Sequence, residues 1–269
     1  MTVREMHESN RAAWNEGALR YAQEVEEDIT FLRGGGINLD APEMPYLKDL
    51  RDWCGRAIHL QCAGGRDTLS LWNLGAKEVV GVDISDRMIA CARQKSEALN
   101  APALWFRSDI LDTPHELDGT ADLVYTGRGA LCWVQDIDAW AAVAARLLKP
   151  GGGQLFVYDG HPLAWVWDME ADHFALDPVY GDYFSREVVA DQGWPEQYIG
   201  DIGIPTEQQA KKYERQWTLA DIVNAVSGAG LRVARLGEHP DAYWDQFPNI
   251  PPDTLRRLPQ TFTLLAERS

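Results

Sequence analysis

A small-residue turn and one acidic residue carry the first chemical signal in this 269-residue chain. Ala63, Gly64 and Gly65 follow a short apolar segment, and their small side chains let the backbone approach a ligand closely. A helix that begins after this turn presents N–H groups, which favour a negatively charged ligand group such as a carboxylate. Asp83 lies eighteen residues after Gly65, at the end of a second apolar segment, where its carboxylate can accept both ribose hydroxyls. Together they predict a site for an adenosine-containing cofactor.

Two classes of cofactor use such a turn. Dinucleotide sites need the pattern G-x-G-x-x-G, because a pyrophosphate must dock on the backbone. The corresponding positions here hold Ala63, Gly65 and Thr68, which is one glycine of three. A nicotinamide-dependent dehydrogenase is therefore only a distant alternative.

Three polar residues follow later apolar segments and could bind or deprotonate a substrate that accepts a transferred group. A hydroxyl acceptor usually needs a general base, and His161, with an ordinary pKa of about 6.5, suits that role. Asp159 could orient His161 or act alone, although a His-Pro pair can also simply fix a turn. Arg128 could bind an acceptor carboxylate or lie on the surface as an ordinary arginine. We predict His161 and Asp159 as catalytic residues.

Alternating apolar and helix-like segments must position these residues. We expect strands at residues 57–62, 78–84, 103–106, 121–126, 155–158, 231–236 and 261–266. We expect helices at residues 7–27, 67–74, 138–148 and 218–229, and another that Ser85 caps. This alternation predicts an α/β fold with a doubly wound, mostly parallel sheet.

The motifs in this order resemble one known family. The runs H-L-Q-C-A-G-G-R-D-T-L-S-L, G-A-K-E-V-V-G-V-D-I-S, S-D-I, A-D-L-V-Y and L-L-K-P-G-G-G resemble the class I S-adenosylmethionine-dependent methyltransferases, most closely their small-molecule branch. The resemblance covers about Arg56 to Asp159 and implies a seven-stranded, Rossmann-like methyltransferase fold. This chain has His59 where the family usually has an acid, and Ala63 where it usually has its middle glycine.

The resemblance also implies a cofactor site for S-adenosyl-L-methionine. The turn from Gln61 to Gly65 would pass under the methionine part, Asp83 would hold the ribose, and Tyr21 would cover the methionine end. The implied cofactor-binding residues are Tyr21, Gln61, Ala63, Gly64, Gly65, Asp83, Ile84, Met88, Asp109, Ile110 and Thr126.

An aromatic-rich insertion follows the fifth expected strand. Residues 160–217 hold ten aromatic residues in 58 positions, which suits an acceptor pocket or lid. A dimer interface or a packed satellite cluster is the alternative, so a homo-oligomer stays open. The substrate-binding candidates are Arg128, Trp133, Trp165 and Tyr180. We divide the chain into an N-terminal helical cap (1–55), a cofactor-binding core (56–159), the acceptor-binding insertion (160–217) and the closing part of the sheet (218–269).

Composition limits which substrates and which cellular location we expect for this chain. The formal net charge is −16, which disfavours nucleic-acid substrates because such ligands need a cationic surface. No long apolar stretch suggests a membrane span, and the four cysteines form no C-x-x-C pair, so we expect a cytoplasmic protein without a bound metal. The predicted activity is methyl transfer to an oxygen or nitrogen of a small metabolite. A protein methyltransferase acting on basic segments and a non-catalytic cofactor-binding module are the alternatives.

Overall fold

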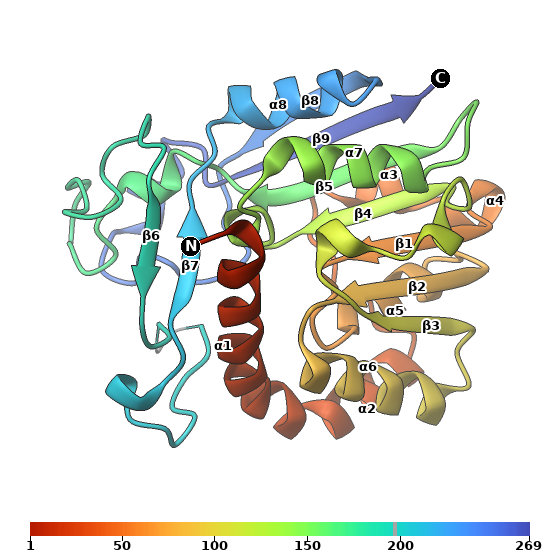
Figure 1. Ribbon diagram of the computed structural model, residues 1–269, viewed down its shortest axis with the longest axis horizontal. Helices are drawn as coiled ribbons and strands as arrows, with labels where there is room; N and C mark the ends of the chain where they lie inside the picture. Colours follow the sequence, from red (N-terminus) through yellow and green to blue (C-terminus); the bar gives the residue numbers. More distant parts are fainter. Residues whose placement is uncertain (196–197) are drawn as a thin grey trace.

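The computed structural model describes residues 1–195 and 198–269, and a seven-stranded sheet forms its centre (Figure 1). Its strands are β1 Arg56–Leu60, β2 Glu78–Asp83, β3 Ala103–Arg107, β4 Leu123–Gly127, β5 Gln154–Gly160, β8 Leu231–His239 and β9 Thr261–Arg268. They lie in the order β3-β2-β1-β4-β5-β9-β8. The first five pair in parallel, whereas β9 runs antiparallel to β5 and β8. The predicted doubly wound, mostly parallel sheet is confirmed.

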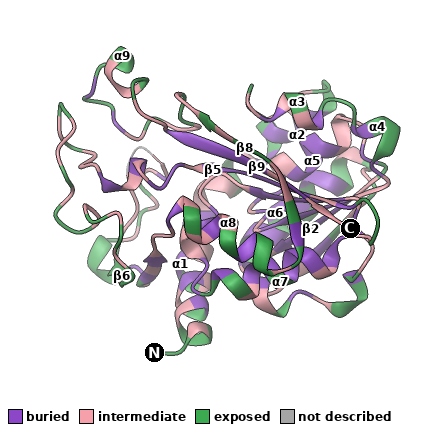
Figure 2. Ribbon diagram, turned by 90° about the horizontal axis from the view of Figure 1, so that it is seen from above, coloured by how far each residue is buried: buried purple, intermediate pink, exposed green. Residues whose placement is uncertain are grey.

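Helices cover both faces of this sheet (Figure 2). The connecting helices are α5 Arg66–Asn73, α6 Asp86–Leu99, α7 Ile137–Leu147 and α8 Leu219–Gly228, with the shorter α3 Met44–Leu47, α4 Leu50–Trp53 and α9 Pro252–Leu255. Successive strand residues point to opposite faces, so Ile58 packs in the cluster that includes α7 and α8. Its neighbour Ala57 packs in the cluster that includes residues of α5 and α6. The parallel strands are therefore buried on both sides, as their apolar sequences require.

Two N-terminal helices, α1 Val3–Gln23 and α2 Val25–Arg33, replace the single helix expected at residues 7–27. That expectation was wrong at Glu24, whose N–H donates to the Tyr21 carbonyl three residues earlier, which ends the first helix. Thr2 and Glu5 form a reciprocal capping box at the start of α1. This helix packs against α6 and lies beside the carboxyl ends of the parallel strands (Figure 1).

The segment between β5 and α8 contains a two-stranded antiparallel ribbon, β6 Val188–Asp191 and β7 Lys212–Arg215. Asn10 of α1 fixes the ribbon in place, because its side chain bonds both the N–H (2.6 Å) and the carbonyl (2.8 Å) of Tyr213. Within the insertion predicted at 160–217, Glu196 and Gln197 lie outside the described residues. Among the helices that the structure describes, none combines the length and hydropathy needed to cross a bilayer.

Candidate active site

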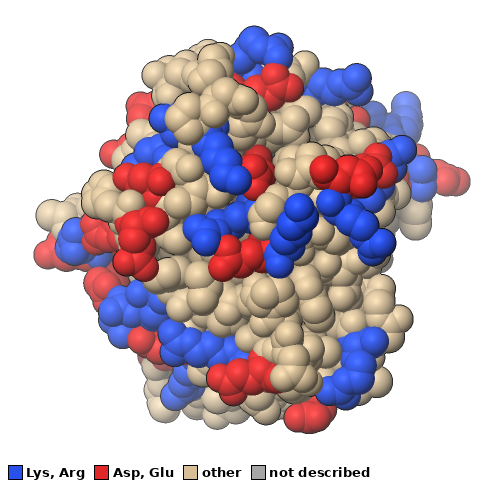
Figure 3. All heavy atoms as spheres, turned by 90° about the vertical axis from the view of Figure 1, so that its right-hand side faces the viewer, with Lys and Arg blue, Asp and Glu red and all other residues tan. Residues whose placement is uncertain are grey.

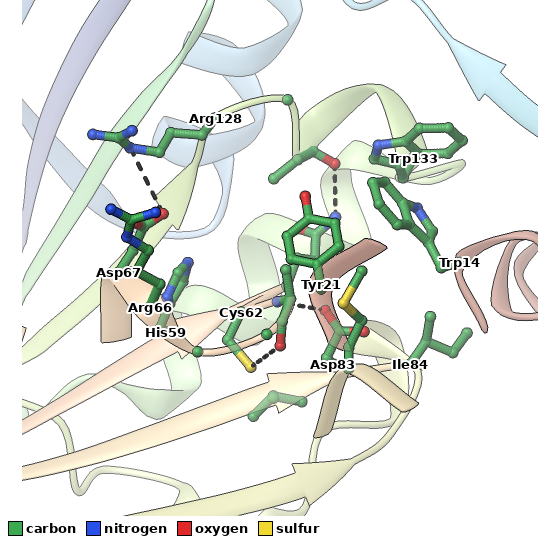
Figure 4. A pocket seen from close by; sticks show the side chains of 18 of the residues that line it. Trp14, Tyr21, His59, Cys62, Arg66, Asp67, Asp83, Ile84, Arg128 and Trp133 are labelled. Carbon is green, nitrogen blue, oxygen red and sulfur yellow. Dashed lines mark hydrogen bonds and ion pairs between the residues drawn. The ribbon is translucent and has the colours of Figure 1, made fainter. Parts of the chain in front are cut away.

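A cavity of about 270 Å³ lies at the carboxyl ends of β1, β2 and β4, beneath α1 (Figure 4). It brings together twelve of the predicted site residues: Tyr21, Gln61, Ala63, Gly64, Gly65, Asp83, Ile84, Met88, Asp109, Ile110, Arg128 and Trp133. The other five do not line it: Thr126, Asp159, His161, Trp165 and Tyr180. The cavity therefore gathers most of the residues that the resemblance implied for the cofactor and few of those predicted for catalysis or the acceptor.

The turn after β1 is a left-handed backbone segment. Gln61 has φ +59°, Ala63 +44° and Gly65 +80°. Gly65 is required, because a Cβ there would lie 2.7 Å from Ala92 and from Trp105. A non-glycine residue in this conformation costs roughly 1–2 kcal/mol, so Gln61 and Ala63 store backbone strain directly under the cavity.

Asp83 holds this strained turn from the end of β2. Its Oδ2 accepts the Ala63 N–H at 2.8 Å, and its Oδ1 accepts the Ser85 N–H at 2.8 Å. Burial raises the pKa of Asp83 to about 6, against the lowering effect of these N–H groups. Each carboxylate oxygen keeps a second lone pair, so the group can still accept two hydroxyl hydrogens from a ligand.

Asp109 lies beside Ile110 at the cavity wall, after β3. Its Oδ1 accepts the Leu111 N–H at 3.0 Å, and its Oδ2 lies 2.8 Å from Nδ1 of His7. Burial would raise the pKa of Asp109, but the His7 contact, the Leu111 N–H and the Arg4 charge together hold the pKa below its ordinary value. The carboxylate is thus oriented from both sides.

His7 is a cavity residue that the sequence analysis missed. Its Nε2 accepts the Gln135 N–H at 3.2 Å, so its Nδ1 carries the proton that Asp109 accepts. His7, Trp14 and Tyr21 all line the cavity. Their seven-residue spacing puts them on one face of α1, and that spacing was the signal available in the sequence.

A buried ion cluster supports the turn from the α2 side. Lys95 is completely buried, and its Nζ lies 2.5 Å from Asp28 Oδ2. Arg66, at the start of α5, lies 3.2 Å from Asp28 Oδ1. A Cβ at Gly64 would lie 3.2 Å from the Lys95 ammonium and 3.4 Å from Tyr21, so the glycine keeps the backbone open to the cavity.

Arg128 lines the cavity but already has carboxylate partners. Its guanidinium lies 2.7 Å from the fully buried Glu43, 3.4 Å from Asp40 and 3.7 Å from Asp67. Its backbone is left-handed (φ +59°), between Gly127 and Gly129. In Figure 4 the guanidinium points toward Asp67 and away from Trp14 and Trp133. The geometry therefore supports a structural role rather than the predicted contact with an acceptor carboxylate.

Asp159 and His161 are buried in other networks. The Asp159 carboxylate accepts N–H groups of Gly129, Ala130, Leu131 and Gly160 at 2.5–3.1 Å, so it shapes the loop after β4 from behind.

The ring of His161 is similarly occupied. Its Nδ1 accepts the Leu163 N–H at 3.0 Å, and its Nε2 lies 3.0 Å from Glu238 Oε1. Burial lowers the pKa of His161 despite the neighbouring Glu238. Neither Asp159 nor His161 reaches the cavity, which removes the geometric basis for proposing them as acid–base groups.

The remaining three predicted residues, Thr126, Trp165 and Tyr180, also lie outside the cavity. The Thr126 hydroxyl is buried and donates to the Leu60 carbonyl at 3.1 Å. Trp165 and Tyr180 pair with each other, with ring centroids 5.9 Å apart, and the Tyr180 hydroxyl donates to Glu214 at 2.7 Å. Both rings therefore pack within the insertion rather than against the cavity.

Six other aromatic side chains line the cavity, and we call them the aromatic wall: Trp14, Tyr21, Trp133, Tyr198, Tyr243 and Trp244. Trp14 lies 5.3 Å from Trp133 and 6.5 Å from Tyr198, measured between ring centroids. Tyr198 in turn lies 5.3 Å from Trp244. A Cβ at Gly129 would lie 3.0 Å from the Tyr243 hydroxyl, so the wall reaches the loop after β4.

Comparison with known proteins shows what the central part of this chain resembles. Residues 57–152 match the family described as "Methyltransferase domain". This segment contains the left-handed turn, Asp83, Asp109 and the loop after β4. This segment is therefore similar to methyltransferase domains.

Solved structures with the same fold share little sequence with it. An S-adenosylmethionine-dependent methyltransferase from Mesorhizobium loti is 21% identical, with a TM-score of 0.58, and the match covers 85% of this chain and 98% of that one. One from Clostridium acetobutylicum is 15% identical, with a TM-score of 0.55 and coverage of 81% and 86%. Geranyl diphosphate C-methyltransferase from Streptomyces coelicolor is 16% identical, with a TM-score of 0.57 and coverage of 86% and 77%. No curated protein sequence matches this chain.

Proposed function

We propose that this enzyme transfers the methyl group of S-adenosylmethionine to an oxygen or nitrogen of a small molecule that binds against the aromatic wall. The observation that carries the proposal is the continuity of one cavity from Asp83 to the aromatic wall. A small acceptor in this cavity would lie next to the cofactor site, shielded by α1. Shielding and positioning are the main contributions an enzyme can make to such an in-line displacement.

The residues at the cofactor end suit the chemistry of S-adenosylmethionine. Asp83 would accept hydrogen bonds from the ribose hydroxyls, and Asp109 would accept one from the adenine amino group. Ile84, Met88 and Ile110 would pack on the adenine ring. Gly64 leaves room for the methionine part beside Tyr21. The cofactor supplies an electrophilic methyl group, and the chain supplies the orientation.

Calorimetric titration with S-adenosylmethionine and S-adenosylhomocysteine tests the cofactor half of this proposal. We expect saturable binding of both compounds. A mass-shift assay with a metabolite extract and with basic peptides then tests the acceptor half. Methylation of a metabolite supports the proposal, whereas methylation of peptides alone would assign the chain to protein methylation instead. A product methylated on carbon would contradict the proposed acceptor atom.

A further inference from the structure

The basic side chains at the cavity all have carboxylate partners. Lys95 and Arg66 both contact Asp28, at 2.5 and 3.2 Å. Arg128 contacts Glu43 at 2.7 Å, and two further carboxylates lie within 4 Å of its guanidinium. An anionic acceptor would therefore compete with carboxylates that are already in place.

Acidic side chains outnumber basic ones along the cavity. Among the described residues, five acids face three bases: Glu24, Asp28, Asp67, Asp83 and Asp109 against Arg66, Lys95 and Arg128. Behind them, Asp40 and Glu43 add two more carboxylates around Arg128. The chain as a whole carries a net charge of −16. A cavity with this balance attracts cations and repels anions.

The aromatic wall offers a second feature that suits a cation. Its indole and phenol rings present negative π-faces, which attract an ammonium group placed within about 6 Å. Burial raises the pKa of Tyr21, Tyr198 and Tyr243, so these phenols stay neutral at physiological pH. Their oxygens can also accept hydrogen bonds from N–H donors.

We propose that the acceptor is an amine, which binds as a cation against the aromatic wall at the loop after β4. This inference rests on the proposed function and narrows its acceptor to one chemical class. The amine first loses one proton to water. Its nitrogen lone pair then bonds the methyl carbon as the carbon–sulfur bond breaks, with the electron pair of that bond remaining on sulfur. The positive charge passes to nitrogen, where the aromatic wall can stabilise it until a second proton leaves.

Binding of two isosteric probes tests the charge preference without any turnover. Choline is the cationic probe, and 3,3-dimethyl-1-butanol replaces its ammonium with a neutral carbon of the same shape. We expect tryptophan fluorescence of the S-adenosylhomocysteine-saturated enzyme to report about tenfold tighter binding of choline. Equal affinity for both probes, or tighter binding of the neutral alcohol, would overturn the inference.

Variants of the aromatic wall locate the binding. Tyr243→Phe should keep the preference for choline, since the ring remains, whereas Tyr243→Leu and, independently, Trp244→Leu should each lower it several-fold. Phe184→Leu is the matched control, because Phe184 is an exposed aromatic (73%) that does not line the cavity. A preference that survives both cavity substitutions to leucine would contradict the placement.

The cofactor titration separates the two proposals. A chain that binds neither S-adenosylmethionine nor S-adenosylhomocysteine contradicts the proposed function. A chain that binds the cofactor but shows no preference for choline contradicts the amine acceptor alone.

Discussion

The two ends of the parallel sheet differ in how deeply their charged side chains are buried and in how strained their backbone is. At the amino ends, charged side chains pair with one another near solvent: Arg56 lies 2.6 Å from Glu78, and Lys149 lies 2.7 Å from Asp122. Asp122 also accepts the Arg56 N–H at 2.9 Å. This side of the molecule shows basic and acidic groups interspersed, with no large field of one sign (Figure 3).

At the carboxyl ends of the strands, strained backbone and buried charged side chains lie close together. In the described part of the chain, four non-glycine residues have positive φ, and three of them, Gln61, Ala63 and Arg128, follow β1 or β4. The fourth, Asn100, is an ordinary helix C-cap. Strained backbone persists only where its surroundings fix it, so we expect the ligand at the carboxyl ends of the strands rather than at the amino ends.

The largest expected effect is the loss of the Arg128 cation. Arg128→Ala leaves the buried Glu43 without its ionic partner, so we expect the free energy of unfolding to fall by about 3 kcal/mol in urea titrations. Arg56→Ala at the amino ends removes a more exposed pair and should cost less than about 1 kcal/mol. Similar losses for the two variants would contradict the contrast between the two ends.

Asp83→Asn should weaken S-adenosylmethionine binding by about 30-fold, measured by calorimetry. An amide replaces one acceptor oxygen with a donor group, which faces backbone N–H groups that also donate. Asp122→Asn is the matched control at the opposite end, since Asp122 also accepts a backbone N–H. Its cofactor affinity should equal that of the wild type, even where its stability falls.

The same carboxyl group predicts a pH dependence of cofactor binding. Burial raises the pKa of Asp83 to about 6. In the proposed cofactor site, only the ionised form would accept hydrogen bonds from both ribose hydroxyls. Affinity should therefore be constant above about pH 7 and fall below pH 6, by at most about tenfold per pH unit. Asp83→Asn should lose this dependence. A wild-type affinity that rises as the pH falls would contradict the role of the carboxylate.

His7→Ala should weaken cofactor binding by about fivefold, because Asp109 loses the partner that orients it. His115→Ala is the control: His115 contacts Asp118 at 2.9 Å in a largely exposed pair ahead of β4. That substitution should change neither affinity nor stability measurably. Equal cofactor affinity in the two variants would show that His7 does not position Asp109 for the ligand.

Much of the sheet could be predicted because its signals are local. Each parallel strand is a short apolar run, Ser85 caps α6 through the Met88 N–H, and Gly65 ends the first strand's turn. These features depend on neighbours within a few residues. Asp83 could be identified in the same way, since its position follows from the end of a strand.

The residues that form the aromatic wall could not be predicted from local patterns. His161 has a suitable side chain, yet Glu238, 77 residues later, holds its ring away from the cavity. The aromatic wall depends on Tyr243 and Trp244, which reach the cavity from the connection between β8 and β9. Such contacts join distant segments, and tertiary packing alone decides which aromatic residues meet.

The smallest expected effect compares one substitution at two positions near the ends of β1. Ala63→Gly removes a Cβ from a left-handed residue, so we expect the free energy of unfolding to rise by up to about 1 kcal/mol. Ala57→Gly, in the buried strand near its amino end, should lower it by roughly the same amount, because glycine loses more entropy in an extended strand. Urea unfolding of both variants measures the difference. Opposite changes in stability for the same substitution would show that backbone strain, rather than packing, sets the carboxyl end of β1 apart from its amino end. A loss of stability in both variants would contradict the strain at Ala63.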